Sequence, residues 1–347
     1  MKKIKVFYII TLVTIVSLLL FNSCGKKTHN GLPEWAIGPF ERYDKNPILE
    51  PTGRGFESNH VYNPGVIITD QKIPAYPELP DTQFFMFYRA EDSQDRSSIG
   101  LALSDDGYNF RRYENNPILH PTEEYELPGG CEDARIVKHN GKYYMYYTGF
   151  HPGKGDHISL CLAVSNDLLN WQKRGPIFDQ KMKNGAVLTN PDNEAVKIDG
   201  KFIMYSSIGG EPYISYSEDL INWDAKILED IQITDEYKPW EFCIAKTDYK
   251  TPNDKILLFL GGTMGPMMNK EKEWHYAISE AVFSREDPEK MIGILDRPVI
   301  IPTKEYEKTG KIQNTVFMNT LVKYHGQWWM YYGGADHVTC LAKSAIR

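Results

Sequence analysis

Two acidic residues and an arginine stand close together in the chain, where Glu132, Asp133 and Arg135 precede the aromatic segment 142–147. A carboxyl group beside a second acid is a candidate general acid, because the neighbouring negative charge raises its pKa and keeps it protonated. Glycosidic cleavage needs such an acid and a second carboxyl group that activates water. Adjacent strand residues point to opposite faces, so we expect only one of the two acids to enter a site.

The aromatic segment after these residues belongs to an internal repeat. Five aromatic-rich segments each lead, through a turn, to a segment with small residues and Ser. The pairs are 83–88 and 99–107, 142–147 and 160–167, 201–205 and 213–219, 255–260 and 276–281, and 327–332 and 339–344. A spacing of about 55 to 70 residues leaves room for the four strands of a propeller blade. The sequence therefore predicts an all-β fold, a five-bladed β-propeller, with segment 35–49 completing the last blade.

Polar residues recur just before or after the aromatic strand of every repeat. One such group alone would be interpreted as charges that pair on solvated turns, but five at equivalent positions favour a shared site at one mouth of the propeller. Carboxylates and amides can hydrogen-bond sugar hydroxyls, and aromatic rings can stack on sugar rings, so the site suits a neutral polyhydroxylated ligand. These residues are Asn63, Arg89, Asp92, Glu132, Asp133, Arg135, Lys183, Glu211, Glu241 and Asp336.

The N-terminus has the pattern of an export signal. Lys2, Lys3 and Lys5 precede an apolar run over 6–21, and Cys24 follows in a context similar to a bacterial lipobox. The run of about 16 residues is shorter than the roughly 20 that span a bilayer, which disfavours an uncleaved transmembrane helix. We expect a lipoprotein signal peptide at 1–23, lipid attachment at Cys24, a tether at 24–34 and the catalytic propeller domain at 35–347.

These features predict an exported lipoprotein, anchored to the outer membrane and facing the periplasm or the cell surface. The lipid would be its only membrane contact. The net charge is −7, and acids and bases are mixed throughout, which argues against a nucleic-acid partner. The spacing of the four cysteines after Cys24 matches no metal motif, so neither a metal nor a cofactor is expected. Cys161 and Cys340 lie in apolar strand-like runs, where buried free thiols are the simplest interpretation.

Taken together, the motifs resemble glycoside hydrolase family 130, the β-mannoside phosphorylases and β-mannosidases, whose fold is a five-bladed propeller. The resemblance implies that Asp133, in a motif that is usually Glu-Asp-Pro-Arg, is the general acid, although this chain has Ala134 in place of the proline. It also implies that a set of polar residues, given at the end of this paragraph as the implied substrate-binding residues, contacts the mannose at the cleavage point. The segments that carry the resemblance are 63–65, 88–92, 99–104, 132–135, 183–186 and 331–336, and the implied substrate-binding residues are Asn63, Arg89, Asp92, Lys183 and Asp336, with Arg135 as a further candidate.

Whether the chain resembles the hydrolases or the phosphorylases of this family depends on other residues. Family phosphorylases carry cationic segments after the third-blade and fourth-blade strands, where this chain has 206–208 (Ser-Ser-Ile) and 260–262 (Leu-Gly-Gly). Glu211 and Glu241 instead resemble the paired glutamates of the family's hydrolases, and a carboxylate near the point of attack repels phosphate and can deprotonate water. We therefore expect an inverting hydrolase of β-mannosidic bonds, β-1,2-linked, in manno-oligosaccharides or mannan, with Asp133 as acid and Glu211 or Glu241 as base.

Three alternatives remain at the level of sequence. A phosphorylase that releases mannose 1-phosphate could use Arg135, Lys183 and His337 as a cationic cluster. A sugar-binding propeller that has lost catalysis would keep the fold without turnover. A related propeller glycosidase could act on arabinose- or xylose-type sugars. The sequence leaves open the linkage, the substrate length, exo or endo action, the choice of base, the membrane leaflet and the oligomeric state.

Overall fold

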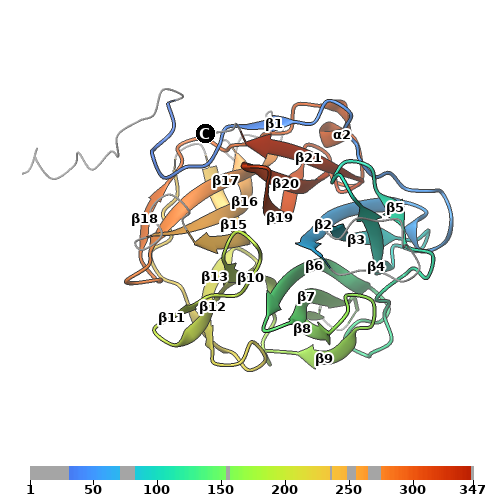
Figure 1. The fold of residues 1–347 in the computed structure, drawn as a ribbon, viewed down its shortest axis with the longest axis horizontal. Coiled ribbons are helices and arrows are strands. Elements are labelled where there is room, and N and C mark those ends of the chain that lie inside the picture. The colour runs from blue at the N-terminus through green and yellow to red at the C-terminus, as the bar shows by residue number, and fades with distance from the viewer. Residues whose placement is uncertain are drawn as a thin grey trace, which may run out of the picture.

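The computed structural model describes residues 31–70, 83–153, 157–234, 237–247, 255–264 and 275–344. The predicted signal peptide, the predicted lipid-attachment residue Cys24 and the tether up to residue 30 lie outside the described residues. Figure 1 shows sheets arranged as blades around a central axis, with β2, β6, β10, β15 and β19 innermost. The predicted all-β, five-bladed propeller is confirmed.

Each blade is an antiparallel sheet, and its strands follow one another along the chain except in the last blade, where β1 joins β21. Neighbouring blades are also joined by short parallel contacts between β4 and β6 and between β10 and β15. A one-turn 3-10 helix (Gly55–Glu57) and a short α-helix, α2 (Glu305–Lys308), lie in the connections. The blades contain β2 (His60–Thr69), β3 (Gln83–Glu91), β4 (Ser97–Ser104) and β5 (Arg111–Arg112); β6 (Gly130–His139), β7 (Lys142–His151), β8 (His157–Ser165) and β9 (Gln172–Pro176); β10 (Lys183–Thr189), β11 (Lys197–Ile198), β12 (Lys201–Ile208), β13 (Glu211–Ser217) and β14 (Asp224–Ile227); β15 (Tyr237–Thr247), β16 (Lys255–Met264), β17 (His275–Ser284) and β18 (Met291–Ile294); and β19 (Val316–Tyr324), β20 (Gln327–Gly334), β21 (Val338–Ser344) and β1 (Phe40–Arg42).

The last blade is completed by the N-terminal strand, as the sequence predicts. Phe40 to Arg42 of β1 pair with Ser344 to Ala342 of β21. Arg42 adds a side-chain link, because its guanidinium donates to the buried carboxylate of Glu307 at 2.6 Å. The two ends of the described chain therefore meet in one sheet and close the ring.

The turn chemistry of the repeat is the same in three blades. In the first, Ser104 Oγ accepts the backbone N–H of Gly107, and Asp106 accepts both the backbone and the side-chain amide of Asn109. The side chains thus satisfy backbone donors that leave the strand. The equivalent trios are Ser165, Asp167 and Asn170, and Ser217, Asp219 and Asn222.

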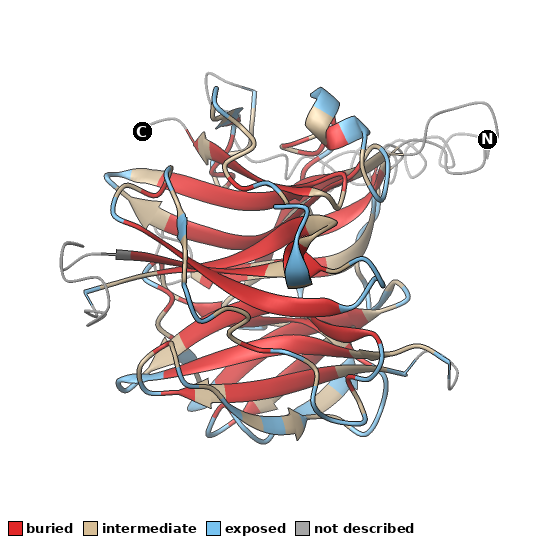
Figure 2. Ribbon diagram, turned by 90° about the vertical axis from the view of Figure 1, so that its right-hand side faces the viewer, coloured by how far each residue is buried: buried red, intermediate tan, exposed pale blue. Residues whose placement is uncertain are grey.

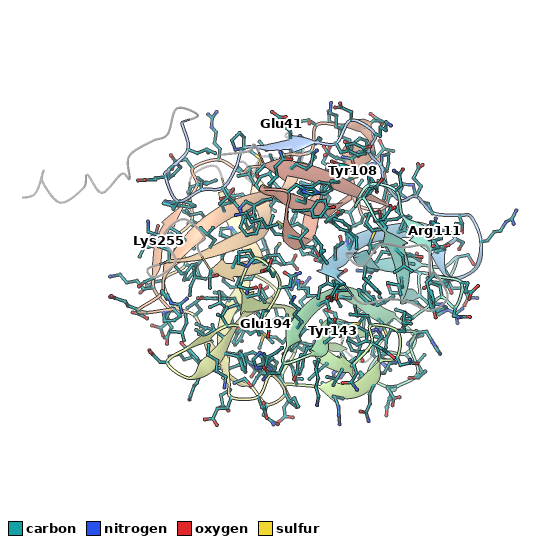
Figure 3. All side chains as sticks on the ribbon, viewed as in Figure 1. Glu41, Tyr108, Arg111, Tyr143, Glu194 and Lys255 are labelled. Atoms are coloured by element: carbon teal, nitrogen blue, oxygen red, sulfur yellow. The ribbon has the colours of Figure 1, made fainter. Side chains whose placement is uncertain are left out.

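The buried residues form the bodies of the strands, and the exposed residues lie mainly in the connections (Figure 2). Glu41, Arg111 and Lys255 mark the outer edge of the ring in Figure 3. Cys161 and Cys340 are buried free thiols, as predicted. Within the described ranges, no helix has the length and apolar character needed to cross a membrane.

Candidate active site

A repeated irregularity of the innermost strands shapes the site. In β2, β6 and β10 the pairing register shifts at equivalent places, between Tyr62 and Gly65, Glu132 and Arg135, and Lys183 and Ala186. A residue with positive φ sits in each bulge: Asn63 (φ 47°), Asp133 (φ 54°) and Asn184 (φ 61°). Asn and Asp adopt this left-handed backbone more readily than other residues with a side chain, so the sequence suits the bulge.

These bulges border a pocket at the mouth of the propeller that contains about 570 Å³ of space, including the part open to solvent. That size is typical of a small-molecule site. Its polar lining comes from all five blades, and Ile312, Tyr276 and Phe317 add an apolar side. The polar lining residues are Asn63, Arg89, Glu132, Asp133, Lys183, Glu241, Thr315 and Asp336.

Both Glu132 and Asp133 line this pocket, so the expectation that only one acid would enter was wrong. The bulge explains the difference, because an extra residue in one strand breaks the alternation of side chains between the two faces. Burial raises the pKa of Glu132, and the neighbouring Asp133 adds to that shift, whereas Arg89 opposes it.

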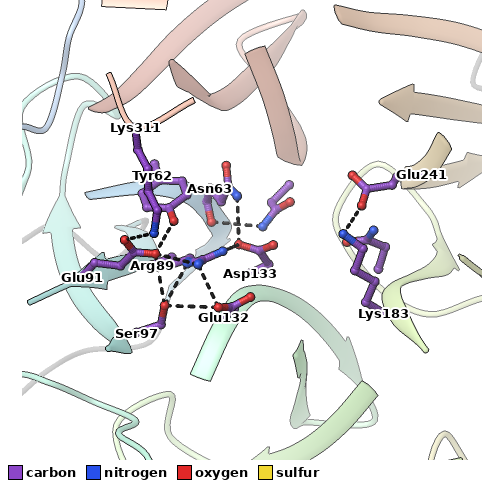
Figure 4. Close-up of polar contacts among 12 residues, drawn as sticks. Tyr62, Asn63, Arg89, Glu91, Ser97, Glu132, Asp133, Lys183, Glu241 and Lys311 are labelled. Carbon is purple, nitrogen blue, oxygen red and sulfur yellow. Dashed lines mark hydrogen bonds and ion pairs between the residues drawn. The ribbon is translucent and has the colours of Figure 1, made fainter. Parts of the chain in front are cut away.

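Arg89 is the centre of a network on one side of the pocket (Figure 4). Its guanidinium donates to Glu132 at 2.8 Å and contacts Asp133 Oδ1 at 3.4 Å. It also pairs with the fully buried Glu91 at 2.6 Å. Although burial opposes ionisation of Glu91, Arg89 and Lys311 hold its pKa at about 2, so Glu91 stays charged beneath the pocket. Asn63 Nδ2 also donates to Asp133 Oδ1, at 2.9 Å.

A second pair lies across from this network in Figure 4. Lys183 forms an ion pair with Glu241 Oε1, and the hydroxyl of Tyr276 donates to Glu241 Oε2 at 2.7 Å. Burial alone would raise the pKa of Glu241. The charge of Lys183 and these hydrogen bonds outweigh it and lower the pKa. Glu241 is therefore held as a carboxylate inside the pocket.

Asp336 has the opposite electrostatic character. It follows β20 in a left-handed backbone conformation (φ 48°) and lines the pocket. Burial raises its pKa to about 7, and the carboxyl groups of Asp133, Glu91 and Glu241 add to the shift, whereas Arg89 opposes it. In the pocket, the environment of Glu241 therefore favours the ionised carboxylate, whereas that of Asp336 favours the protonated form.

Three predicted site residues are not among those that line the pocket. Glu211 is exposed at the start of β13 and accepts a hydrogen bond from Tyr213. Asp92 closes its own turn, accepting the backbone N–H of Gln94 and pairing with Arg96 at 2.8 Å. Arg135 is buried beneath the pocket, at 4% exposure.

Several residues that take part in the site had no role in the sequence prediction. Glu132 was named among the polar residues of the repeat but was not assigned a role, and Glu91 lies in the same motif as Arg89 without having been singled out. Thr315 and Phe317 lie in the polar segment that precedes the aromatic strand of the fifth repeat, but neither was assigned a role. Tyr276 comes from a strand whose aromatic character is also explained by packing, so no sequence signal distinguished it. Across the described ranges, no group of three or more His, Cys, Asp or Glu side chains is placed to hold a metal ion.

Comparisons with known proteins agree on one family. The model of glycoside hydrolase family 130, described as beta-1,4-mannooligosaccharide phosphorylase, matches residues 40–347. A 1,2-beta-oligomannan phosphorylase from Thermoanaerobacter sp. (strain X514) is 33% identical over 315 residues, which cover 87% of this chain and 96% of the relative.

Two solved structures share the fold closely. One, described with glycoside hydrolases of the GH130 family that target beta-1,2 mannosidic linkages in Candida mannan, has a TM-score of 0.78 and 30% identity, covering 92% of this chain and 96% of the other. A glycosyl hydrolase from Bacteroides ovatus has a TM-score of 0.77 and 29% identity, covering 90% and 95%.

Proposed function

The chain belongs to glycoside hydrolase family 130, and on this premise we propose that it hydrolyses β-mannosidic bonds with inversion. The proposed substrates are β-1,2-linked manno-oligosaccharides or mannan. Support for the linkage comes from a relative named for 1,2-beta-oligomannan and a structural neighbour associated with beta-1,2 mannosidic linkages. Support for hydrolysis comes from the charges in the pocket.

The observation that carries the proposal is that both basic side chains among the described residues that line the pocket form ion pairs with carboxylates. Arg89 pairs with Glu91 and Glu132, and Lys183 pairs with Glu241. A phosphate ion would have to displace a carboxylate to reach either cation. Water is neutral and meets no such competition, so this arrangement favours water as the attacking group.

Asp133 is the proposed general acid, and its contacts define which oxygen carries the proton. Asn63 and Arg89 both donate to Oδ1. An oxygen that accepts two donors is a poor place for a proton, so the proton belongs on Oδ2. In the proposed reaction Oδ2 protonates the glycosidic oxygen as the bond to the anomeric carbon breaks.

Glu241 is the proposed base, acting on a water that attacks the anomeric carbon from the opposite side. Its lowered pKa keeps it ionised, and its place in the lining puts it beside the substrate space. The exposed position of Glu211 favours Glu241 in this role. Lys183 and Tyr276 would orient the carboxylate and compensate its charge.

One alternative has a specific observation in its favour: the 33% identical relative is named a phosphorylase. The cationic cluster expected for that reading is not assembled in the described lining. Arg135 does not line the pocket, and His337 Nδ1 lies 2.9 Å from His60 Nδ1, outside the lining. Export as a lipoprotein through Cys24 remains a separate proposal from the sequence.

The assignment of the base is tested with the matched variants Glu241→Gln and Glu211→Gln on β-1,2-mannobiose. We expect the first to lower kcat by about 100-fold or more, because general-base catalysis typically contributes 10²–10⁴-fold. The second should stay within about threefold of wild type. Proton NMR should show α-mannose as the first product. A larger loss in Glu211→Gln than in Glu241→Gln, or β-mannose as the first product, would overturn the assignment.

A further inference from the structure

A second cavity runs along the propeller axis, and all five innermost strands line it. It contains about 350 Å³ of space, including any part open to solvent, between β2, β6, β10, β15 and β19. Its polar lining differs from that of the candidate active site, because it includes two basic side chains and no carboxyl group. The polar lining residues are Arg135, Thr189, Asn193, Lys246, Asn319 and Thr320.

Arg135 brings a buried positive charge to this cavity, and no carboxylate among the described residues forms a direct ion pair with it. Its side chain is 4% exposed, and its Nη2 reaches Asn184 Oδ1 at 3.2 Å and Asn319 Oδ1 at 3.5 Å. Its Nε and Nη1 are buried without a hydrogen-bond partner among the described residues. A buried guanidinium with two unused donors is costly unless a ligand or water accepts them, because arginine keeps its charge.

Lys246 supplies the second basic group, at 1% exposure. Its ammonium donates to the backbone oxygen of Asn190 at 3.2 Å and to the side chain of Asn193. Both acceptors are neutral, and the described residues include no ion pair to this lysine. Burial lowers the pKa of Lys246 to about 7, and the charge of Lys138 adds to the shift, whereas the charge of Asp192 opposes it.

We propose that the axial cavity binds a small inorganic anion of the halide class, chloride under ordinary conditions, between Arg135 and Lys246. The two cations come from different blades, and the carboxylates of the candidate active site lie in a separate lining. Water could accept the unused N–H groups but would not neutralise the charge, whereas one anion does both. A bound anion would also join the blades from within, independently of the reaction at the mouth.

The site is tested by crystallising the protein in sodium bromide and measuring anomalous scattering at the bromine edge. We expect a bromide peak on the axis within hydrogen-bonding distance of Arg135 or Lys246. The Lys246→Met variant should lose that peak, and Lys246→Arg, which keeps the charge, should retain it. A wild-type map with water and no anomalous signal in the cavity would overturn the proposal.

A solution measurement provides a second readout. Thermal unfolding is followed in sodium gluconate and in sodium chloride at equal ionic strength. A site with a Kd near ~10 mM would increase the folding equilibrium constant about tenfold at ~100 mM chloride. The exposed Lys142→Met is the matched control and should keep the chloride response, while Lys246→Met should lose it. An equal response in wild type and Lys246→Met would contradict the site.

Discussion

At the scale of single residues, the carboxyl groups of the pocket differ in the partners that surround them. Glu241 accepts from Lys183 and Tyr276, which favour the ionised form. Asp336 has a pKa raised to about 7, mainly by burial. Asp133 accepts hydrogen bonds from Asn63 and Arg89 on Oδ1, and its side chain lines the open pocket. Different protonation states within one pocket are what a two-carboxyl mechanism requires.

Replacing Asp133 by Asn tests the acid without disturbing the backbone. Asparagine already occupies the equivalent bulge positions 63 and 184, so Asp133→Asn should keep the wild-type melting temperature within about 2 °C. Loss of the transferable proton should lower kcat by about 10²–10⁴-fold on substrates with unactivated leaving groups. Mannose release and a circular dichroism melt measure the two effects. Near-normal turnover in a folded variant would remove Asp133 from the role of acid.

The raised pKa of Asp336 predicts a pH-dependent stability. Its carboxyl binds a proton in the folded state up to about pH 7, but in the unfolded chain only up to about 3.8. The folded state therefore binds more protons across this window, and the contribution of Asp336 to stability falls as the pH rises from about 4 to 7. Asp336→Asn should remove that contribution.

Urea unfolding of both proteins between pH 4 and 7 checks this prediction. The free energy of unfolding of wild type, relative to Asp336→Asn, should decline towards neutral pH. A difference that stays constant over the window, or that grows with pH, would show that the Asp336 carboxyl is not protonated in the folded state.

At the scale of elements, the bulged inner strand is the unit that builds the site. The bulge in β2 is fixed from the neighbouring blade, because Asn319 Nδ2 donates to the backbone oxygen of Asn63 and Thr320 Oγ1 donates to that of Pro64. Gly65 then passes so close to β6 that an added Cβ would lie 2.2 Å from the backbone oxygen of Ala134. The position of Asp133 therefore depends on the contact between β2 and β6.

Gly65→Ala tests this dependence. The new methyl group must push the two bulges apart, so we expect a loss of about 1–3 kcal/mol in stability and a lower kcat. Gly293→Ala is the matched control, because its Cβ would meet Val282 at an ordinary 3.4 Å and should change stability by less than about 0.5 kcal/mol. Chemical denaturation and mannose release measure both. Equal stability of the two variants would mean that the bulges do not need this close approach.

The bulge also marks the limit of prediction from sequence at this scale. The aromatic strands follow local rules, and the repeated aromatic-rich segments predicted them correctly. The alternation rule failed at Glu132 because a register shift depends on pairing with β7, which is not visible in the sequence of β6. Asp92 was misplaced for a related reason: its turn uses both carboxylate oxygens locally.

At the scale of the whole molecule, closure of the ring places different residues from five similar blades around one pocket. The pairing of β1 with β21 brings the last blade against the first, so that Asp336 and Asn63 line the same space. The repeat predicted the ring, and the polar residues found once per blade predicted a polar site at one mouth of the ring. Six residues named from the sequence line the pocket: Asn63, Arg89, Asp133, Lys183, Glu241 and Asp336. The ion pair that joins Lys183 to Glu241 from a different blade was not predictable, because it depends on how the blades pack together.

The pairing of every described basic lining residue with a carboxylate is the basis for choosing water over phosphate, and one measurement tests that choice. The purified protein is incubated with β-1,2-mannobiose in phosphate-free buffer and across a phosphate titration, and the products are separated by anion-exchange chromatography. The account predicts mannose as the sole product, at a rate that added phosphate does not increase. Mannose 1-phosphate, formed at a rate that rises and saturates with phosphate, would contradict it.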